Sequence, residues 1–135
     1  MADTLVQPYL FFGGRCEEAL EFYRSAIGAQ VDVVMKFKDS PEPPPSGVLQ
    51  PGFENKVMHA SFRVGATTLM ASDGCHAGSK FDGFSLSLTV PTEAEADRGR
   101  VKMPLDKTFW SPRFGMLTDR FGIGWMVNVA SESSK

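Results

Sequence analysis

His59 is the side chain of this sequence best suited to acid–base chemistry, because an imidazole can gain or lose a proton near neutral pH. It lies in an apolar run over residues 57–64 that alternates in the manner of a β-strand. His59 and Ser61 fall on the polar face of that strand, whereas Ala60 and Phe62 fall on the apolar face. We predict that His59 is a catalytic residue, and a structural role for this lone histidine stays open as the alternative.

A second group of residues has the character of a small-molecule site, in which a mostly apolar wall carries a few polar groups. Residues 84–90 alternate as a strand and place small serine hydroxyls on one face, which leaves room for a ligand. The predicted ligand-binding residues are Gln7, Tyr9, Ser61, Ser85, Ser87, Phe109, Trp110, Met126 and Asn128. The alternative is a sheet whose polar face simply meets water.

The composition excludes several classes of protein. With 135 residues and a net charge of −2, the chain fits one globular domain and has no basic run that would bind nucleic acid. No apolar stretch approaches the roughly 20 residues of a membrane span, and the first residues lack the features of a signal peptide. The 2 cysteines are too few for a disulfide framework. We therefore expect a cytoplasmic protein with reduced thiols and neither a nucleic-acid nor a membrane partner.

The order of the elements predicts an α+β fold made of the same unit twice. The first unit is expected to have strands over residues 5–12, 30–37, 56–64 and 66–73 and a helix over residues 15–27. The apolar stripe of that helix is expected at Ala19, Phe22, Tyr23, Ala26 and Ile27. The second unit is expected to have strands over residues 84–90, 101–105, 114–118 and 125–129 and a helix over residues 92–98. Each unit therefore has the predicted order β-α-β-β-β.

Several stretches together carry a resemblance to a known family. They are PYLFFGG at residues 8–14, EALEFY at 18–23, VMHA at 57–60 and the aromatic hairpin at 114–129. With these stretches the chain resembles the PhnB-like branch of the glyoxalase/bleomycin-resistance (vicinal oxygen chelate) superfamily. The resemblance implies one glyoxalase-like domain, residues 1–135, in which two curved half-sheets close around a cavity. It implies module one at residues 1–73, a linker at 74–83 and module two at 84–130.

The resemblance also implies a metal site, and this chain departs from it. Enzymes of the superfamily bind a divalent metal through His, Gln and Glu side chains on particular strands. The matching positions fall near Gln7, at Ala71 or Ser72, at Ser85 and at Met126. None of these residues is a carboxylate, and an amide with a hydroxyl is a poor set for zinc, which prefers about four N, S or O ligands. We expect neither a metal nor another cofactor, while weak binding of a divalent metal stays open.

The methyltransferase label that this branch has also carried has no support in the motifs. Gly13 and Gly14 do not form a Gly-x-Gly-x-x-Gly loop, and the expected element order contains no βαβ nucleotide-binding unit. The predicted second helix is also shorter than in relatives, which carry several further turns at this point. Either the helix is shortened in this protein or residues are missing from the sequence. We favour the second, because the apolar face needed to cover the second half-sheet is otherwise absent.

Two functions of different class stay open. One is an enzyme of unassigned activity that acts on a small oxygenated metabolite and has a degenerate metal site. The other is a non-catalytic protein that binds and sequesters a small molecule, as antibiotic-resistance members of the superfamily do. The resemblance further implies a homodimer, with exchange of modules between the two chains as one form that it can take.

Overall fold

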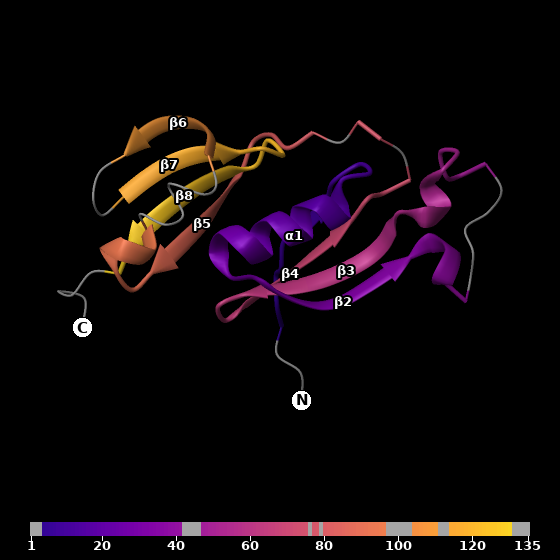
Figure 1. Ribbon diagram of the computed structural model, residues 1–135, viewed down its shortest axis with the longest axis horizontal. Helices are drawn as coiled ribbons and strands as arrows, with labels where there is room; N and C mark the ends of the chain where they lie inside the picture. Colours follow the sequence, from indigo (N-terminus) through magenta and orange to yellow (C-terminus); the bar gives the residue numbers. More distant parts are fainter. Residues whose placement is uncertain are drawn as a thin grey trace. The chain divides into compact units, whose positions relative to one another are not determined.

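The chain forms two compact units, Met1–Ser79 and Lys80–Lys135, and each unit contains one four-stranded sheet (Figure 1). A computed structural model of the protein describes residues 4–41, 47–75, 77–78, 80–96, 104–110 and 114–130, of which 104–110 by the backbone alone. Among these residues, no helix is long and apolar enough to cross a lipid bilayer.

The first sheet has the strand order β1-β4-β3-β2. Its strands are β1 (Tyr9–Phe11), β2 (Gln30–Lys36), β3 (Val57–Val64) and β4 (Thr67–Ser72). β1 pairs with β4 in parallel, and the other two pairs are antiparallel. β3 and β4 form the predicted hairpin around Gly65, which has a φ of 58°. β1 is shorter than the predicted strand because Pro8, which precedes it, has no N–H for the ladder.

The second sheet repeats this arrangement in the order β5-β8-β7-β6. Its strands are β5 (Ser85–Val90), β6 (Pro104–Trp110), β7 (Phe114–Asp119) and β8 (Gly124–Val129). Here too the first strand pairs in parallel with the last, and the other pairs are antiparallel. The shared order confirms that the chain repeats one unit. The prediction for β6 was wrong in its bounds, because the strand continues past residue 105 to Trp110.

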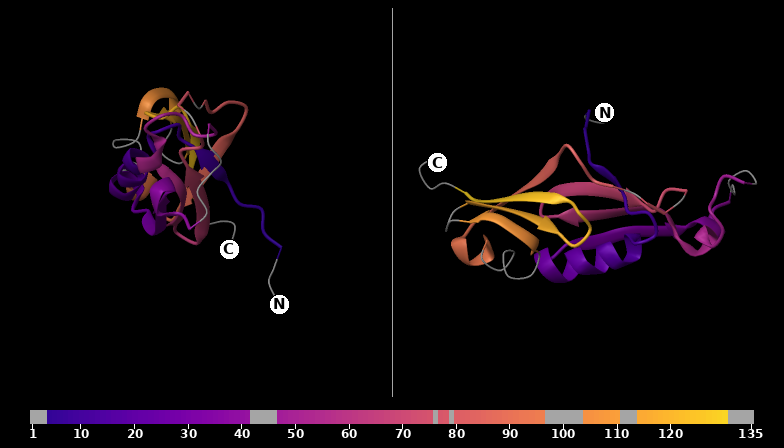
Figure 2. Two further views of the ribbon diagram at one scale, coloured as in Figure 1. Left: turned by 90° about the vertical axis from the view of Figure 1, so that its right-hand side faces the viewer. Right: turned by 90° about the horizontal axis from the view of Figure 1, so that it is seen from above.

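Helix α1 (Cys16–Ile27) lies along one face of the first sheet (Figure 1, Figure 2). The ring of Tyr23 stacks on that of Phe62 in β3, with ring centroids 6.0 Å apart. The buried stripe is Cys16, Ala19, Leu20 and Tyr23, whereas the predicted stripe members Phe22, Ala26 and Ile27 are only half-buried. The prediction was right for Ala19 and Tyr23 and wrong for the other three residues. Gly28 ends α1 in the left-handed conformation.

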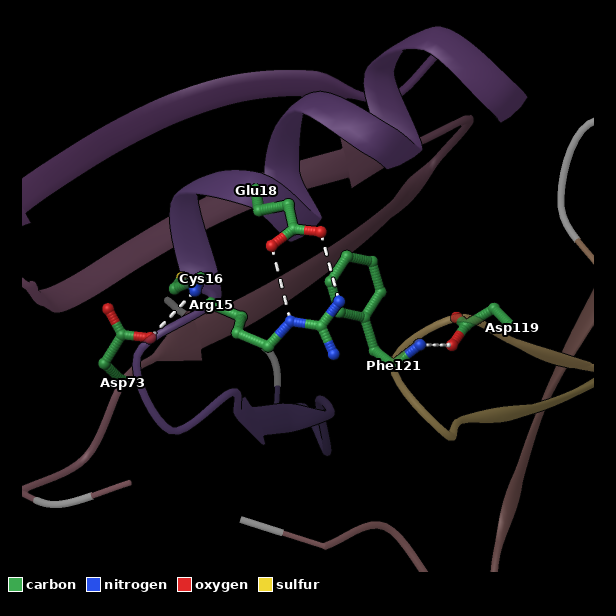
Figure 3. Close-up of polar contacts among 6 residues, drawn as sticks. All are labelled: Arg15, Cys16, Glu18, Asp73, Asp119 and Phe121. Atoms are coloured by element: carbon green, nitrogen blue, oxygen red, sulfur yellow. Dashed lines mark hydrogen bonds and ion pairs between the residues drawn. The ribbon is translucent and has the colours of Figure 1, made fainter. Parts of the chain in front are cut away.

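Asp73 lies immediately after β4 and contacts the start of α1, although the two are far apart in the sequence (Figure 3). One carboxylate oxygen accepts hydrogen bonds from the backbone N–H groups of Gly14 and Cys16, at 2.7 and 2.8 Å. The other accepts one from the N–H of Val57 at 2.9 Å. No side chain of the residue before the helix caps it. A buried carboxylate therefore takes the place of a local cap and joins three segments.

Asp119 has the matching role in the second unit, at the end of β7 (Figure 3). Its Oδ1 accepts hydrogen bonds from the N–H groups of Phe121 and Ile123, at 2.8 and 3.1 Å, and shapes the turn to β8. Its Oδ2 accepts one from the indole N–H of Trp125 at 2.8 Å. Asp73 and Asp119 are thus structural residues, one at a strand end and the other at a turn.

The described part of the second helix is short. Residues 93–96 are helical, and the Thr92 hydroxyl accepts a hydrogen bond from the Glu95 N–H at 3.2 Å, which makes Thr92 the N-cap. Residues 97–103, which include the end of the predicted helix, lie outside the described residues.

Candidate functional site

The face of the first sheet opposite α1 contains a pair of side chains that can do acid–base chemistry. The hydroxyl of Tyr9 in β1 lies 3.0 Å from Nδ1 of His59 in β3, which is hydrogen-bonding distance. The two rings are tilted, with centroids 5.8 Å apart. Two residues that the sequence analysis chose separately, from strands on either side of β4, are therefore in direct contact.

The register of the strands shows what surrounds this pair. Residues paired across neighbouring strands share a face of the sheet, and residues two apart in one strand do so as well. The pairings of Ser61 with Met70, Met70 with Tyr9, and His59 with Met35 place all five on one face, which we call the open face. The polar groups of this face are thus set among apolar side chains.

Two further members of the open face were missed by the sequence analysis. Phe11 stacks on Tyr9 with ring centroids 5.1 Å apart, and Val33 pairs with Ser61. Tyr9, Phe11 and Val33 keep 39%, 49% and 47% of their surface exposed, which is high for apolar side chains. The alternation of Tyr9 with Phe11 in the sequence is the signal that could have identified Phe11.

The protonation of Tyr9 follows from its surroundings. Partial burial of the phenol raises the pKa of Tyr9, and the nearby Cys16 thiol, if charged, raises that pKa further. Tyr9 is therefore a neutral hydroxyl at physiological pH and can donate a hydrogen bond.

The predicted site residues of the second unit form their own cluster. Ser87 pairs with Met126, and Ser85 lies two residues before Ser87 on the same face of β5. The amide of Asn128 donates a hydrogen bond to the Ser87 hydroxyl at 3.1 Å. The serines are exposed, while Met126 and Asn128 are half-buried. One cavity shared by this cluster and the open face stays a prediction.

The remaining predicted residues are less closely tied to either cluster. Gln7 precedes β1, and its amide donates a long hydrogen bond of 3.4 Å to the carbonyl of Thr68. The backbones of Phe109 and Trp110 pair with Met116 and Gly115 in β7. The side chains of these two residues lie outside the described part of the structure.

The donors at the positions implied for a metal do not fit one. Ala71 offers no donor, and the buried Ser72 hydroxyl donates to the carbonyl of Val57 at 3.3 Å and accepts from the N–H of Gly74 at 2.9 Å. Across the part of the chain that the structure describes, no three His, Cys, Asp or Glu side chains gather in a way that could hold a metal ion. These donors would be poor ligands for a divalent cation, and the absence of a metal stays a prediction.

The two cysteines are expected to differ sharply in reactivity. Cys16 is fully buried in α1, and burial, followed by the charges of Asp73 and Glu17, raises the pKa of its thiol far above the usual value. Cys75 is half-buried in a loop. Iodoacetamide at about pH 8, close to the ordinary thiol pKa, should alkylate Cys75 in the native protein and Cys16 only after unfolding in urea. Peptide mass mapping measures both, and rapid alkylation of native Cys16 would contradict this prediction.

Known proteins resemble this chain over nearly its whole length. Protein YjdN of Escherichia coli (strain K12) is 32% identical over an alignment that covers 94% of this chain and 96% of that protein. The alignment spans 143 positions, more than the 135 residues of this chain, so YjdN carries residues that are absent here. The crystal structure of PA1353 from Pseudomonas aeruginosa superimposes with a TM-score of 0.74 at 39% identity, covering 94% of this chain and 98% of that one.

More distant structures define the fold. A PhnB protein from Bacillus cereus, described as a putative 3-demethylubiquinone-9 3-methyltransferase, has a TM-score of 0.71 at 26% identity and covers 94% of this chain and 100% of that one. The fosfomycin resistance protein FosX from Mesorhizobium loti has a TM-score of 0.59 at 12% identity, with 99% and 97% covered. At that identity the likeness shows the fold alone, and it is the glyoxalase/bleomycin-resistance fold.

The family assignment rests on the sequence profile as well as on these structures. Residues 4–128 match the profile of 3-demethylubiquinone-9 3-methyltransferase. The predicted resemblance to the PhnB-like branch is confirmed by this match and by the PhnB structure. This chain belongs to the PhnB-like 3-demethylubiquinone-9 3-methyltransferase family.

Proposed function

We propose that this chain acts on a small oxygenated molecule bound against the open face of its first sheet, with His59 as the acid–base group. The single observation that carries the proposal is the contact between the Tyr9 hydroxyl and His59 Nδ1 at 3.0 Å. A histidine oriented by a hydrogen bond at one ring nitrogen can use the other nitrogen for a ligand.

The surroundings of this pair support a small-molecule site. Phe11, Met35 and Met70 supply apolar surface next to one imidazole, one phenol and the Ser61 hydroxyl. Ligand sites usually have this composition, with few polar groups that fix orientation and apolar groups that supply contact area. Because the donors present do not suit a metal, we assign no step to one.

The proposal is tested with acetophenone, a flat molecule with one carbonyl oxygen. Titration into isotope-labelled protein should shift the NMR signals of Tyr9, His59 and Ser61. While a base of the solvent removes a methyl proton, His59 can give a proton to the carbonyl oxygen, and it should in this way speed the exchange of the methyl protons for deuterium in D₂O. In His59→Gln, which keeps a hydrogen-bonding amide but cannot transfer a proton, we expect binding to persist and the exchange to fall to the solvent rate.

The matched control is Glu54→Gln, which alters an exposed side chain of the short 3₁₀-helix η2 (Phe53–Asn55), away from the open face. It should match the wild type in binding and in exchange. Signal shifts outside the open face, or none at all, would contradict the site.

A non-catalytic binding protein is the second candidate, and the exposed aromatic pair of Tyr9 and Phe11 favours it. Such a pair can stack on a flat ligand without any chemistry. If acetophenone binds the open face but the wild-type protein does not speed the exchange, this second function replaces the first.

Methyl transfer, which the family description names, is not part of our proposal. Within the described residues each sheet has one parallel pair and two antiparallel pairs, whereas a dinucleotide-binding unit of the Rossmann type needs consecutive parallel strands with crossover helices. The homodimer and the cytoplasmic location stay predictions.

A further inference from the structure

Either Tyr9 or His59 can be the donor in the hydrogen bond between them. The choice decides whether His59 offers a ligand on the open face a hydrogen-bond donor or an acceptor. If the Tyr9 hydroxyl donates to Nδ1, the neutral imidazole must have its hydrogen on Nε2 and can donate to a ligand. If Nδ1 carries the hydrogen and donates to the tyrosine oxygen, Nε2 is an acceptor. The 3.0 Å distance fits both arrangements.

The surroundings favour donation by the tyrosine. Within the described residues, neither the Tyr9 hydroxyl nor the imidazole of His59 has another hydrogen-bond partner. An imidazole nitrogen is a strong acceptor, whereas a phenol oxygen is a weak one because its lone pair is shared with the ring. Only donation from Tyr9 to Nδ1 uses the better donor and the better acceptor of the pair. The raised pKa of Tyr9 supports this arrangement, because it keeps the hydroxyl protonated.

We infer that Tyr9 is a positioning residue that holds His59 in the Nε2–H tautomer, so that the open face takes ligands presenting an acceptor oxygen beside a flat apolar group. The first half concerns the free protein, and the second half rests on the proposed function. On an imidazole ring the two nitrogens point in diverging directions, so the donor at Nε2 is directed away from Tyr9.

The charges and rings nearby narrow the class of ligand. Arg63, on the same face of β3, is already paired with Asp32, with an Nε–Oδ2 distance of 3.0 Å, and donates to Gln30 as well. An anionic ligand would therefore have to compete with Asp32 for this cation. The stacked rings of Tyr9 and Phe11 offer exposed aromatic surface to a flat group. A neutral carbonyl compound with a conjugated or aromatic part fits these groups best.

The tautomer is measured by ¹⁵N NMR of the imidazole in the free protein. The chain has 2 histidines, so a His76→Gln background leaves one imidazole to observe. At about pH 9, well above the ordinary histidine pKa, we expect Nε2 to carry the hydrogen and Nδ1 to be the bare nitrogen. In Tyr9→Phe the two shifts should move toward the averaged values of a free imidazole, while Phe11→Leu should leave them unchanged. A hydrogen on Nδ1 in the wild type would overturn the inference.

The ligand class is measured with two probes of the same shape. Acetophenone and α-methylstyrene differ only in an acceptor oxygen replaced by a methylene group. One hydrogen bond is worth about 1 kcal/mol, so acetophenone should bind about fivefold more tightly. This preference should be lost in His59→Leu. Equal binding of both probes to the open face would overturn the inference and leave the site standing. Binding of neither would overturn the site itself, whatever the tautomer.

Discussion

Replacing Asp73 by alanine should lower the free energy of unfolding by about 3–5 kcal/mol, because two buried N–H groups and one part-buried N–H group lose their acceptor together. Asp73 is 1% exposed and accepts from Gly14, Cys16 and Val57. Each unsatisfied buried donor costs about 1–3 kcal/mol, and partial entry of water reduces the sum. Since whole domains are stable by only about 5–15 kcal/mol, this variant should be close to unfolding at room temperature.

Asp73→Asn tests the same point in a protein that should still fold. The amide oxygen can replace the carboxylate oxygen that faces Gly14 and Cys16, but the NH₂ group then faces the N–H of Val57, which is also a donor. We expect a loss of about 2–3 kcal/mol in urea unfolding followed by circular dichroism. The control Asp82→Asn changes an exposed carboxylate and should cost nothing measurable. If both asparagine variants are as stable as the wild type, the bonds of Asp73 are not what holds these segments.

The second large effect is expected at Asp119, which is fully buried in the other unit. In Asp119→Asn the amide cannot accept from Phe121 and Ile123 with one atom and from the Trp125 indole with the other. The NH₂ group of the new asparagine must then face at least one of these N–H donors. We expect the free energy of unfolding to fall by about 2–3 kcal/mol in the same urea measurement.

A double-mutant cycle with Trp125→Phe isolates the contact to the indole. Phenylalanine keeps an aromatic ring but removes the N–H that Asp119 accepts. Because the two changes remove one shared hydrogen bond, their combined cost should fall short of the sum by about 1–2 kcal/mol. Strict additivity would show that Asp119 acts through the turn alone.

The sequence predicted the elements of the candidate site well and its contacts poorly. The period-2 alternation of residues 57–64 places His59 and Ser61 on one face without any structure, because successive residues of a strand point to opposite sides. Alternation says nothing about which strands are neighbours. The contact of Tyr9 with His59 exists because β1 and β3 both pair with β4, and this order brings residues 50 positions apart within 3.0 Å.

The errors in the predicted stripe of α1 and at Phe11 have a physical cause as well. The stripe of α1 was predicted from apolar residues, yet Phe22 is half-buried and Cys16 is fully buried, because the sheet on which the helix packs decides which side faces inward. Phe11 was missed for a related reason, since a phenylalanine in a short edge strand looks like core until the register shows it on the open face.

By itself the sequence determined the order of the elements, the repeat of one unit, the ends of α1 and the family. These properties depend on local periodicity, on glycines and on motifs that are continuous in the chain. Only the tertiary structure decided that Asp73 and Asp119 are buried acceptors and that Tyr9 meets His59. A carboxylate in a turn has the same sequence signal whether it faces water or three N–H groups, and only the packing of distant segments around it distinguishes the two.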